Sequence, residues 1–534
     1  MLFFVIITIF IEIALAEDFK TVSLDQGDVR GIKYWNGDYY EFYGVPYASV
    51  PTGKDKYKEP LPPKPWKGMY EANIDNIICT QIYFDDENEF AYGQDDCLVL
   101  NLFVPTVASE TNLIPVVVYI HSGGFAVGHG NIAKYNYLVR HAVLVISLNY
   151  RLGASGFLCL GTEDIPGNAG LKDQVAALKW IKKNIKKFGG DPNRVTVAGF
   201  SVGAAMAELL TLSNSTRGLI DKIILDSGSG LASWAVNRDP VKTALNIALS
   251  MGYNKTSDLK DLTDFYLNVD TDELAIKSLN FHLKNGTFGL APCVENVFKG
   301  AEPFLTELPD DIFIKGTYQK IAVLTGFSNM EGLSRISKLQ EWNYEMEKDF
   351  AQFLPTDLKL KDDRTKRELA KEIKFYYFHN KTVTENTIME YIDYFSDSLF
   401  TYKILKSAKL HTKSERPVYL YEFSYVGDLS MKHFFMDKVK GASHRDVTSY
   451  ILDFYSWTAN YKDMDIRDRL TAMWADFIKY ENPTAYESVL VNYKWPQYKE
   501  ESAEYLSIDM DVEIKKNILK ERYQFWDKIY LKYS

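Results

Sequence analysis

A serine between two glycines is the first feature of this chain that could do chemistry. Ser201 stands in the run Gly199-Phe200-Ser201-Val202-Gly203, after a short β-branched segment and before an alanine- and leucine-rich one. These segments predict a strand that turns into a helix, with the serine at the corner. On so tight a turn, a Cβ at either glycine would collide with neighbouring chain. The pattern indicates a nucleophile beside a helix N-terminus, which favours developing negative charge.

A serine hydroxyl is a weak nucleophile until a base accepts its proton. Five histidines follow the serine in the chain and could be that base: His282, His379, His411, His433 and His444. We favour His444, because small residues precede it in a predicted loop after a late strand. His433 lies between a lysine and two phenylalanines, which is more typical of a surface or packing histidine.

The base in turn needs an acid that orients its ring, and two residues are candidates. Glu331 comes shortly after a predicted strand, 321–325, and Asp226 ends an earlier one, 223–225. Both fit an order of serine, acid and histidine, with each residue on a loop that follows a strand. The residues alone therefore leave the choice of acid open.

A second strand runs into consecutive glycines. The apolar run 116–120 is followed by His121, Ser122, Gly123 and Gly124. Backbone N–H groups at such glycines can point at one spot with no side chain in the way, as an oxyanion hole requires. The same string is equally compatible with a simple glycine turn.

Alternating strand and helix signals surround these residues. Strands are predicted at 98–104, 116–120, 143–148, 195–197, 223–225, 321–325 and 418–424, and helices at 170–187 and 514–532. Strand, helix, strand in this order predicts a parallel sheet with right-handed crossovers. An aromatic-rich stretch, 27–66, alternates as a small antiparallel sheet would. We therefore expect an α/β fold: a large, mostly parallel central sheet flanked by helices, with a small N-terminal antiparallel sheet.

Composition narrows the function classes. The chain has 534 residues, 46% of them hydrophobic and 25% charged, as is ordinary for a large globular protein. Because there is no repeat, low-complexity tract or long linker, we expect one domain over 17–534. The net charge is −10 and the charged residues are dispersed, so the sequence has no basic patch of the kind that binds nucleic acid. No metal-ligand spacing or phosphate-binding glycine loop is present, so neither a metal nor a cofactor is expected.

The N-terminal segment predicts secretion. Residues 1–16 are mostly apolar, with Glu12 as the one charged residue, and end in Ala14-Leu15-Ala16, which is typical of a signal peptide cut before Glu17. We find no retention signal or anchor tail at the other end, so we expect an extracellular protein without a membrane anchor. In the secretory pathway, four Asn-x-Ser/Thr sequons are expected glycan sites: Asn214, Asn254, Asn285 and Asn380.

Four cysteines are few for a chain of this length, so we expect the core rather than disulfides to hold the fold. Cys79 and Cys97 could close a short loop, and we expect a bridge between them. Cys159 and Cys293 lie in apolar segments and are expected to remain buried thiols.

These residues resemble the type-B carboxylesterase/cholinesterase family of α/β-hydrolases, whose members include secreted carboxylesterases of the insect type. Besides the serine turn, the resemblance extends over nearly the whole chain through the blocks 42–48, 95–101, 147–151, 156–158, 167–174 and 188–192. It implies a catalytic triad of Ser201, Glu331 and His444, in preference to Asp226. It also implies an oxyanion hole formed by the N–H groups of Gly123, Gly124 and Val202.

The resemblance has structural implications as well. It implies the Cys79–Cys97 disulfide and two ion pairs, Arg151 with Asp173 and Lys56 with Asp95. The second pair should be looser than usual, because lysine cannot make the bidentate fork of an arginine.

Departures from the family pattern narrow the substrate. Members that act on choline esters carry a tryptophan in the first disulfide loop and a glutamate before the serine, which together hold a quaternary ammonium. Here the loop between Cys79 and Cys97 has no tryptophan, and Phe200 precedes the serine. Ser122 and Val202 stand where glycine and alanine are usual, which could reduce activity or the size of the acyl group.

The resulting hypothesis is a secreted serine carboxylesterase for a neutral, apolar ester of a hormone, an odorant or pheromone, or a xenobiotic. The alternative is a member that has kept the fold and lost the chemistry, an adhesion or ligand-sequestering protein. Such members usually lack a triad residue, and none is missing here.

Overall fold

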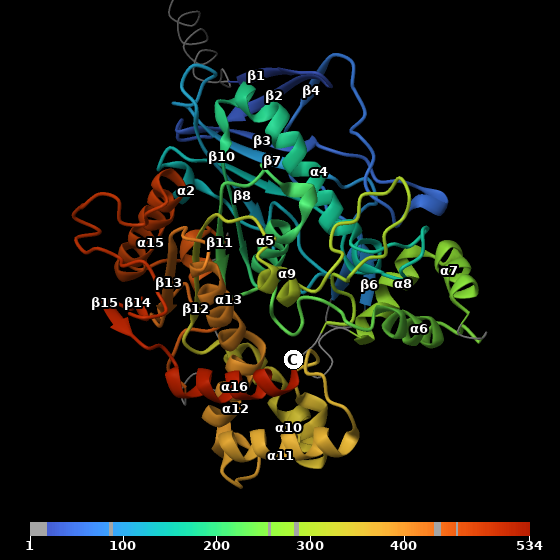
Figure 1. Ribbon diagram of the computed structural model, residues 1–534. Coiled ribbons are helices and arrows are strands. Elements are labelled where there is room, and N and C mark those ends of the chain that lie inside the picture. The colour runs from blue at the N-terminus through green and yellow to red at the C-terminus, as the bar shows by residue number, and fades with distance from the viewer. Residues whose placement is uncertain (1–18, 85–88, 255–257, 282–287, 432–438, 455–457) are drawn as a thin grey trace, which may run out of the picture.

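One large sheet runs through the molecule. The computed structural model describes residues 19–534 except 85–88, 255–257, 282–287, 432–438 and 455–457, so the predicted leader lies outside the described residues. Thirteen strands of the described residues form this sheet, twelve of them in the order β1-β2-β3-β7-β9-β8-β10-β11-β12-β13-β14-β15, with β4 beside β2 (Figure 1). The bounds are β1 Phe19–Leu24, β2 Gly27–Lys33, β3 Tyr39–Pro46, β4 Met69–Glu71, β7 Val99–Pro105, β8 Ile114–Ile120, β9 Leu144–Leu148, β10 Gly190–Phe200, β11 Lys222–Asp226, β12 Ala322–Ser328, β13 Val418–Phe423, β14 Glu504–Ile508 and β15 Val512–Lys516.

The middle of the sheet is parallel, as the alternation of strands and helices predicts. From β9 through β8, β10, β11, β12 and β13 to β14, every neighbouring pair is parallel. The antiparallel strands expected near the N-terminus, β1 to β3, form one edge of this same sheet. A separate two-stranded antiparallel sheet consists of β5 (Gln81–Phe84) and β6 (Glu89–Tyr92). The fold is therefore the α/β architecture that the sequence predicts.

Helices cover both faces of the sheet. The α-helices are α2 Asn136–Val139, α3 Gly153–Phe157, α4 Ala169–Asn184, α5 Val202–Leu212, α6 Pro240–Ser250, α7 Leu259–Asn268, α8 Thr271–Ser278, α9 Pro309–Lys315, α10 Leu339–Lys348, α11 Asp363–Phe378, α12 Ile388–Ser396, α13 Tyr402–Thr412, α14 Asp446–Ile451, α15 Tyr461–Tyr480 and α16 Lys520–Tyr533. Shorter 3₁₀ turns include η2 (Ile185–Phe188) and η5 (Glu331–Lys338), and η8 (Asp397–Thr401) is a π-helix. Within the described part of the chain, no helix is both long and apolar enough to cross a bilayer.

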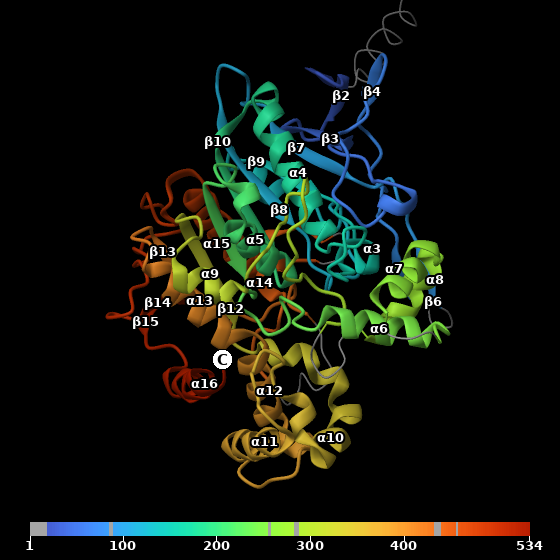
Figure 2. The same ribbon diagram turned by 45° about the vertical axis from the view of Figure 1, so that its right-hand side comes forward.

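The two faces of the sheet pack into two different cores. Along β8, Val116 and Val118 belong to the core that includes α4 and α5, whereas Val117 and Tyr119 belong to the core that includes α2 and α15. This alternation follows from the two-residue period of a strand, and both sets are apolar because helices cover both faces. The turned view separates two further groups of helices, α6–α8 at one side and α10–α12 at the lower end (Figure 2).

The predicted strand 195–197 is the end of the longer β10, and the antiparallel strands begin at Phe19 rather than at residue 27. The largest difference is at the C-terminal end. The predicted closing helix, 514–532, is wrong in its first residues: Val512–Lys516 is strand β15, antiparallel to β14, and the helix begins at Lys520. The alternating Val512-Glu513-Ile514-Lys515 fits the two-residue period of an edge strand, which explains the difference.

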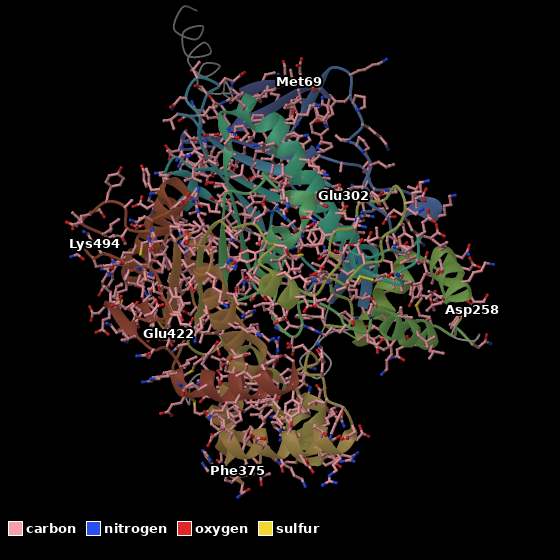
Figure 3. The ribbon with its side chains drawn as sticks, viewed as in Figure 1. Met69, Asp258, Glu302, Phe375, Glu422 and Lys494 are labelled. Atoms are coloured by element: carbon pink, nitrogen blue, oxygen red, sulfur yellow. A yellow bond between two sulfur atoms is a disulfide. The ribbon has the colours of Figure 1, made fainter. Side chains whose placement is uncertain are left out.

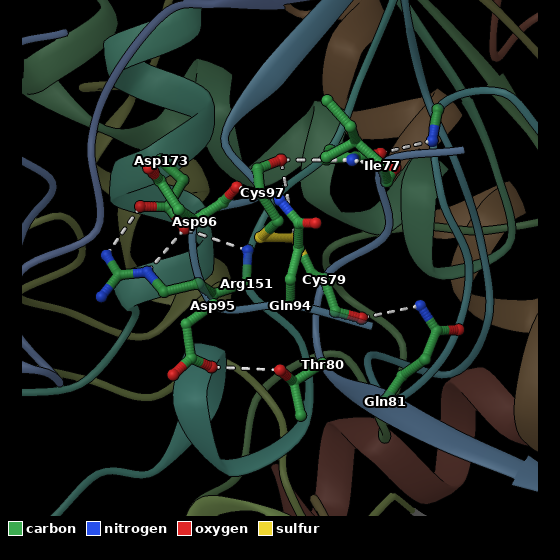
Figure 4. Close-up of a disulfide and its surroundings, with 12 residues drawn as sticks. Ile77, Cys79, Thr80, Gln81, Gln94, Asp95, Asp96, Cys97, Arg151 and Asp173 are labelled. Atoms are coloured by element: carbon green, nitrogen blue, oxygen red, sulfur yellow. Dashed lines mark hydrogen bonds and ion pairs between the residues drawn. A yellow bond between two sulfur atoms is a disulfide. The ribbon is translucent and has the colours of Figure 1, made fainter. Parts of the chain in front are cut away.

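The cysteines form two disulfides. Cys79 is bonded to Cys97, with Arg151 and Asp173 close by (Figure 4). The prediction that the other two are free thiols is wrong, because Cys159 and Cys293 form a second disulfide that spans 134 residues. Gly167 lies against this bridge: a Cβ there would be 2.5 Å from the Cys293 sulfur and 2.7 Å from the Cys159 sulfur. An apolar sequence context does not distinguish a buried thiol from a buried disulfide.

We expect removal of the long-range bridge to lower stability. In the chain-entropy treatment, a closed loop of this length contributes on the order of 5 kcal/mol, so the double variant Cys159→Ser/Cys293→Ser should unfold at a clearly lower temperature. Differential scanning fluorimetry of both proteins checks this. Peptide mapping without reductant should recover the Cys159 and Cys293 peptides linked, and their recovery as free thiols would contradict the bridge.

Candidate active site

The turn at Ser201 has the geometry that the sequence predicts. β10 ends at Phe200, α5 begins at Val202, and Ser201 between them has φ 56° and ψ −120°. This left-handed conformation is costly for a serine and is kept only because the surroundings enforce it. A Cβ on Gly199 would lie 2.3 Å from the Gly203 carbonyl carbon, and one on Gly203 would lie 2.3 Å from the Ile120 oxygen. Both glycines are therefore required by close approach of the backbone.

The structure brings Ser201, His444 and Glu331 into one hydrogen-bonded relay. His444 Nε2 lies 2.9 Å from Ser201 Oγ, and His444 Nδ1 lies 2.5 Å from Glu331 Oε2. With the proton on Nδ1, the ring donates to the carboxylate, and Nε2 is free to accept from the serine hydroxyl. Glu331 is fully buried, so little water screens its charge from the ring.

Hydrogen bonds between two loops fix the distance between the acid and the base. Glu331 follows β12, and its Oε1 accepts from the Ser328 N–H at 2.8 Å. The Met330 N–H donates to the Ala442 carbonyl at 3.0 Å, and the Ala442 N–H donates to the Asn329 side chain at 2.8 Å. The strand-end loops that carry Glu331 and His444 are therefore joined to each other immediately before the two functional residues.

Asp446 hydrogen-bonds to the backbone of the loop that carries His444, and sequence reasoning missed this contact. Its two carboxylate oxygens accept from the Met431 and Ser443 N–H groups, both at 2.7 Å. The side chain is almost fully buried at the start of α14. The sequence signal for this contact was its position two residues after His444. An acid at such a position can accept hydrogen bonds from the backbone N–H groups of the loop that carries the histidine.

Asp226, the other acid considered from the sequence, has different partners. Its Oδ1 accepts from the Tyr421 hydroxyl at 2.8 Å, and its Oδ2 accepts from the Thr448 hydroxyl at 2.8 Å. Its backbone carbonyl accepts from the Ser201 N–H. Burial raises the pKa of this carboxyl to about 7. Asp226 thus supports the end of β10 through its backbone, while its side chain hydrogen-bonds elsewhere than His444.

The glycine run after β8 forms the turn beside the serine. Gly123 has φ 122° and Gly124 has φ 63°, and a Cβ on Gly123 would lie 1.7 Å from the Val127 oxygen. The N–H groups of Gly123, Gly124 and Val202 donate to no described residue. Val202 is the first residue of α5, where helix geometry leaves the N–H without an intrahelical acceptor. These three N–H groups are therefore available as donors among the described residues.

A buried histidine supports this glycine turn. His121 stacks on Tyr150 at 4.3 Å between ring centroids, and the Tyr150 hydroxyl donates to the His121 carbonyl at 2.8 Å. Burial lowers the pKa of His121 to about 3, so the ring is neutral at physiological pH. The neutral ring therefore places no positive charge beside the glycine turn.

Aromatic rings enclose the relay. Phe200 and Phe400 contact the His444 ring at centroid distances of 4.6 and 4.4 Å. Trp234 lies 6.0 Å from Phe400 and 5.6 Å from Phe288, and Phe288 lies 5.7 Å from Phe125 of the glycine turn. Sequence reasoning missed Trp234, Phe288 and Phe400, because rings so far apart in the chain give no local signal.

One predicted ion pair forms and the other does not. Arg151 donates through Nε and Nη2 to the two oxygens of Asp173 at 2.8 and 2.6 Å, and both side chains are buried. Lys56 instead donates to the Val269 carbonyl at 3.2 Å, and Asp95 accepts from the Thr80 hydroxyl (Figure 4). The Lys56 ammonium has a backbone carbonyl as its acceptor, and it lacks the bidentate geometry with which an arginine would hold the Asp95 carboxylate.

A family model described as the carboxylesterase family matches residues 18–526. The chain belongs to the carboxylesterase family. It is 34% identical to Esterase FE4 of Myzus persicae, over 87% of this chain and 85% of the relative. It is 31% identical to a juvenile hormone esterase of Heliothis virescens, over 86% of this chain and 85% of the relative.

A solved structure agrees with this family membership. The juvenile hormone esterase of Manduca sexta, with OTFP covalently attached, has a TM-score of 0.85 to this carboxylesterase at 28% identity, and the match covers 96% of this chain and 100% of that one. The predicted family, α/β-hydrolase fold and ester hydrolase class are confirmed.

The two candidate acids should separate cleanly by mutation. Glu331→Gln removes the charge that stabilises the imidazolium, and kcat for p-nitrophenyl butyrate should fall by about 10³–10⁴-fold. Asp226→Asn should retain most of the wild-type kcat, because its side chain does not contact His444. The reverse ranking of these two variants would assign the acid to Asp226.

The raised pKa of Asp226 predicts a pH dependence of stability. An unfolded carboxyl titrates near 3.9, and the folded one titrates at about 7. The folded state therefore binds the proton more tightly, and its stabilising contribution is lost as pH rises through this window. The melting temperature of the wild type minus that of Asp226→Asn should decrease from pH 5 to 7 and then level off. A difference that grows with pH would contradict a raised pKa.

Proposed function

We propose that this chain is a secreted serine carboxylesterase that hydrolyses neutral, apolar carboxylic esters through an acyl-enzyme. The observation that carries the proposal is the relay from Ser201 Oγ through His444 to Glu331, with distances of 2.9 and 2.5 Å. It lies at the carboxyl ends of parallel strands, where α/β-hydrolases hold their nucleophile.

The chemistry follows from this geometry. Ser201 Oγ attacks the ester carbonyl carbon while His444 Nε2 takes the hydroxyl proton, and Glu331 stabilises the imidazolium. The tetrahedral oxyanion accepts hydrogen bonds from the backbone N–H groups at 123, 124 and 202. His444 then gives its proton to the departing alcohol. Water repeats the sequence on the acyl-enzyme and releases the carboxylic acid.

The enclosure around the relay supports an apolar substrate. Phe200, Phe400, Trp234 and Phe288 present ring surface, which gains free energy by covering aliphatic or aromatic groups. A carboxylate that would hold a quaternary ammonium is absent at position 200, next to the nucleophile. Among the expected ester classes, the likeness to two juvenile hormone esterases supports an apolar hormone-type ester.

Two disulfides and exposed sequons support secretion. Disulfides form and persist in oxidising compartments such as the secretory pathway. Asn214, Asn254 and Asn380 are exposed, as glycan attachment requires, and Asn285 lies outside the described residues. Glycosylation at these sites is part of the proposal.

Loss of the nucleophile tests the proposal. Ser201→Ala should reduce kcat/KM for p-nitrophenyl acetate and butyrate by about 10⁴-fold or more, since the triad acts as a unit. Release of p-nitrophenol by purified wild type and variant is the measurement. Equal rates from the two proteins would favour the non-catalytic alternative.

Mass spectrometry can test directly whether Ser201 forms a covalent bond with a substrate-like reagent. An organophosphate should add its phosphoryl group to Ser201 in the wild type, and the modified peptide should be identified by tandem mass spectrometry. Ser201→Ala should acquire no such adduct, and an adduct on another serine would move the nucleophile.

A further inference from the structure

The guanidinium of Arg335 has no hydrogen-bond or ion-pair partner among the described residues. This residue lies on η5, four residues after Glu331, and is half-buried. Its Nε is shielded from solvent and makes no hydrogen bond. No ion pair joins its guanidinium to any of the described residues; its recorded contact is the Phe400 ring, 5.9 Å from Cζ to the centroid. Burial lowers the pKa of Arg335 to about 10, so the group is still charged at neutral pH.

Three other buried or half-buried arginines of the described residues have hydrogen-bond acceptors. Arg151 forms a fork with Asp173, Arg522 bonds to Asp393 and Asp397, and Arg467 donates to the Ser449 carbonyl. A shielded guanidinium nitrogen without an acceptor costs stability, because it loses hydration and gains no hydrogen bond in exchange. An unpaired one therefore calls for an explanation other than packing.

The position of Arg335 relates it to the acyl side of the proposed site. Phe400 contacts Arg335 and also the His444 ring, at 4.4 Å. From Phe400, the aromatic series continues through Trp234 and Phe288 to Phe125, which directly follows Gly124. These four rings are called the aromatic wall, and Arg335 lies at its end remote from Phe125. An ester bound with its carbonyl oxygen at Gly123 and Gly124 would have its acyl chain beside this wall if the chain extends toward Trp234.

We propose that Arg335 is a specificity-determining residue that binds an acceptor oxygen on the acyl chain of the ester, remote from the bond that is cleaved. The inference rests on the proposed function and narrows it: the acyl chain is apolar along the aromatic wall and carries an oxygen near its end. A guanidinium offers five N–H donors and no acceptor, so its ligand is a carboxylate or a neutral carbonyl or ether oxygen.

Three esters of p-nitrophenol test this assignment. The pentanoate has an apolar five-carbon acyl chain, the hydrogen glutarate has the same chain length with a terminal carboxylate, and the levulinate carries a ketone oxygen. For Arg335→Met, the ratio of kcat/KM for glutarate over pentanoate should fall about tenfold or more relative to wild type, because a charge-assisted hydrogen bond is lost. Arg335→Lys should recover part of the ratio, because it keeps the charge.

A matched control is available at Arg364. This arginine is highly exposed on α11, the helix that carries Phe375 at the lower edge of the molecule, and it pairs with Glu368 (Figure 3). Arg364→Met removes the same charge far from the relay, so its glutarate-to-pentanoate ratio should equal that of wild type. Melting temperatures of all variants establish that they are folded.

The outcomes are decisive in both directions. A ratio in Arg335→Met within twofold of wild type, or an equal loss for both esters, would overturn the assignment and leave a structural or general electrostatic role. A loss for glutarate and levulinate together shows that a neutral oxygen suffices, and a loss for glutarate alone shows that the anion is required; both support it.

Failure of the proposed esterase function would give a different experimental result from failure of the Arg335 assignment. If wild type hydrolyses none of the three esters, the esterase proposal fails, and binding decides the role of Arg335. Calorimetric titration with monomethyl glutarate should then show binding about tenfold weaker in Arg335→Met than in wild type. Equal binding by the two proteins would overturn the inference as well.

Discussion

The close approach of three backbone segments at the serine turn is the constraint on which the remaining geometry depends. The start of α5 lies so near the ends of β8 and β10 that neither Gly199 nor Gly203 has room for a side chain. This contact holds Ser201 in a left-handed conformation that an unsupported serine would leave. The same contact places the first N–H of α5 next to the glycine turn after β8. The positions of the proposed nucleophile and of the proposed oxyanion donors thus both depend on the same close packing of strand ends against the start of α5.

The base and the acid depend on a second feature, the bonding between adjacent strand-end loops. Because β12 and β13 are parallel neighbours, the chain after each emerges at the same edge of the sheet. Hydrogen bonds of Met330 and Ala442 then join the two loops directly. The buried carboxylate of Asp446 fixes the segment before His444. The relay therefore needs no movement to assemble, and its polar groups are ordered in surroundings that water scarcely reaches.

Sequence reasoning located the parts of this site that have a local signature. Ser201 could be predicted because the glycines beside it report a backbone constraint, and Glu331 could be proposed because it follows a strand; the resemblance to a family chose it over Asp226. The second disulfide was missed, since an apolar context suits a thiol and a bridge equally. The aromatic wall and the unpaired Arg335 could not be foreseen, because both arise from contacts between residues distant in the chain.

The order of the three functional residues along the chain has a consequence for biosynthesis. Ser201 precedes His444 by 243 positions, so a growing polypeptide contains its proposed nucleophile long before the ribosome has added the proposed base. The strand β13 and the loop behind it must emerge before any hydroxyl proton can be withdrawn. Under the proposed mechanism, a nascent chain is therefore inert toward esters until the final fifth of the polypeptide has joined the sheet.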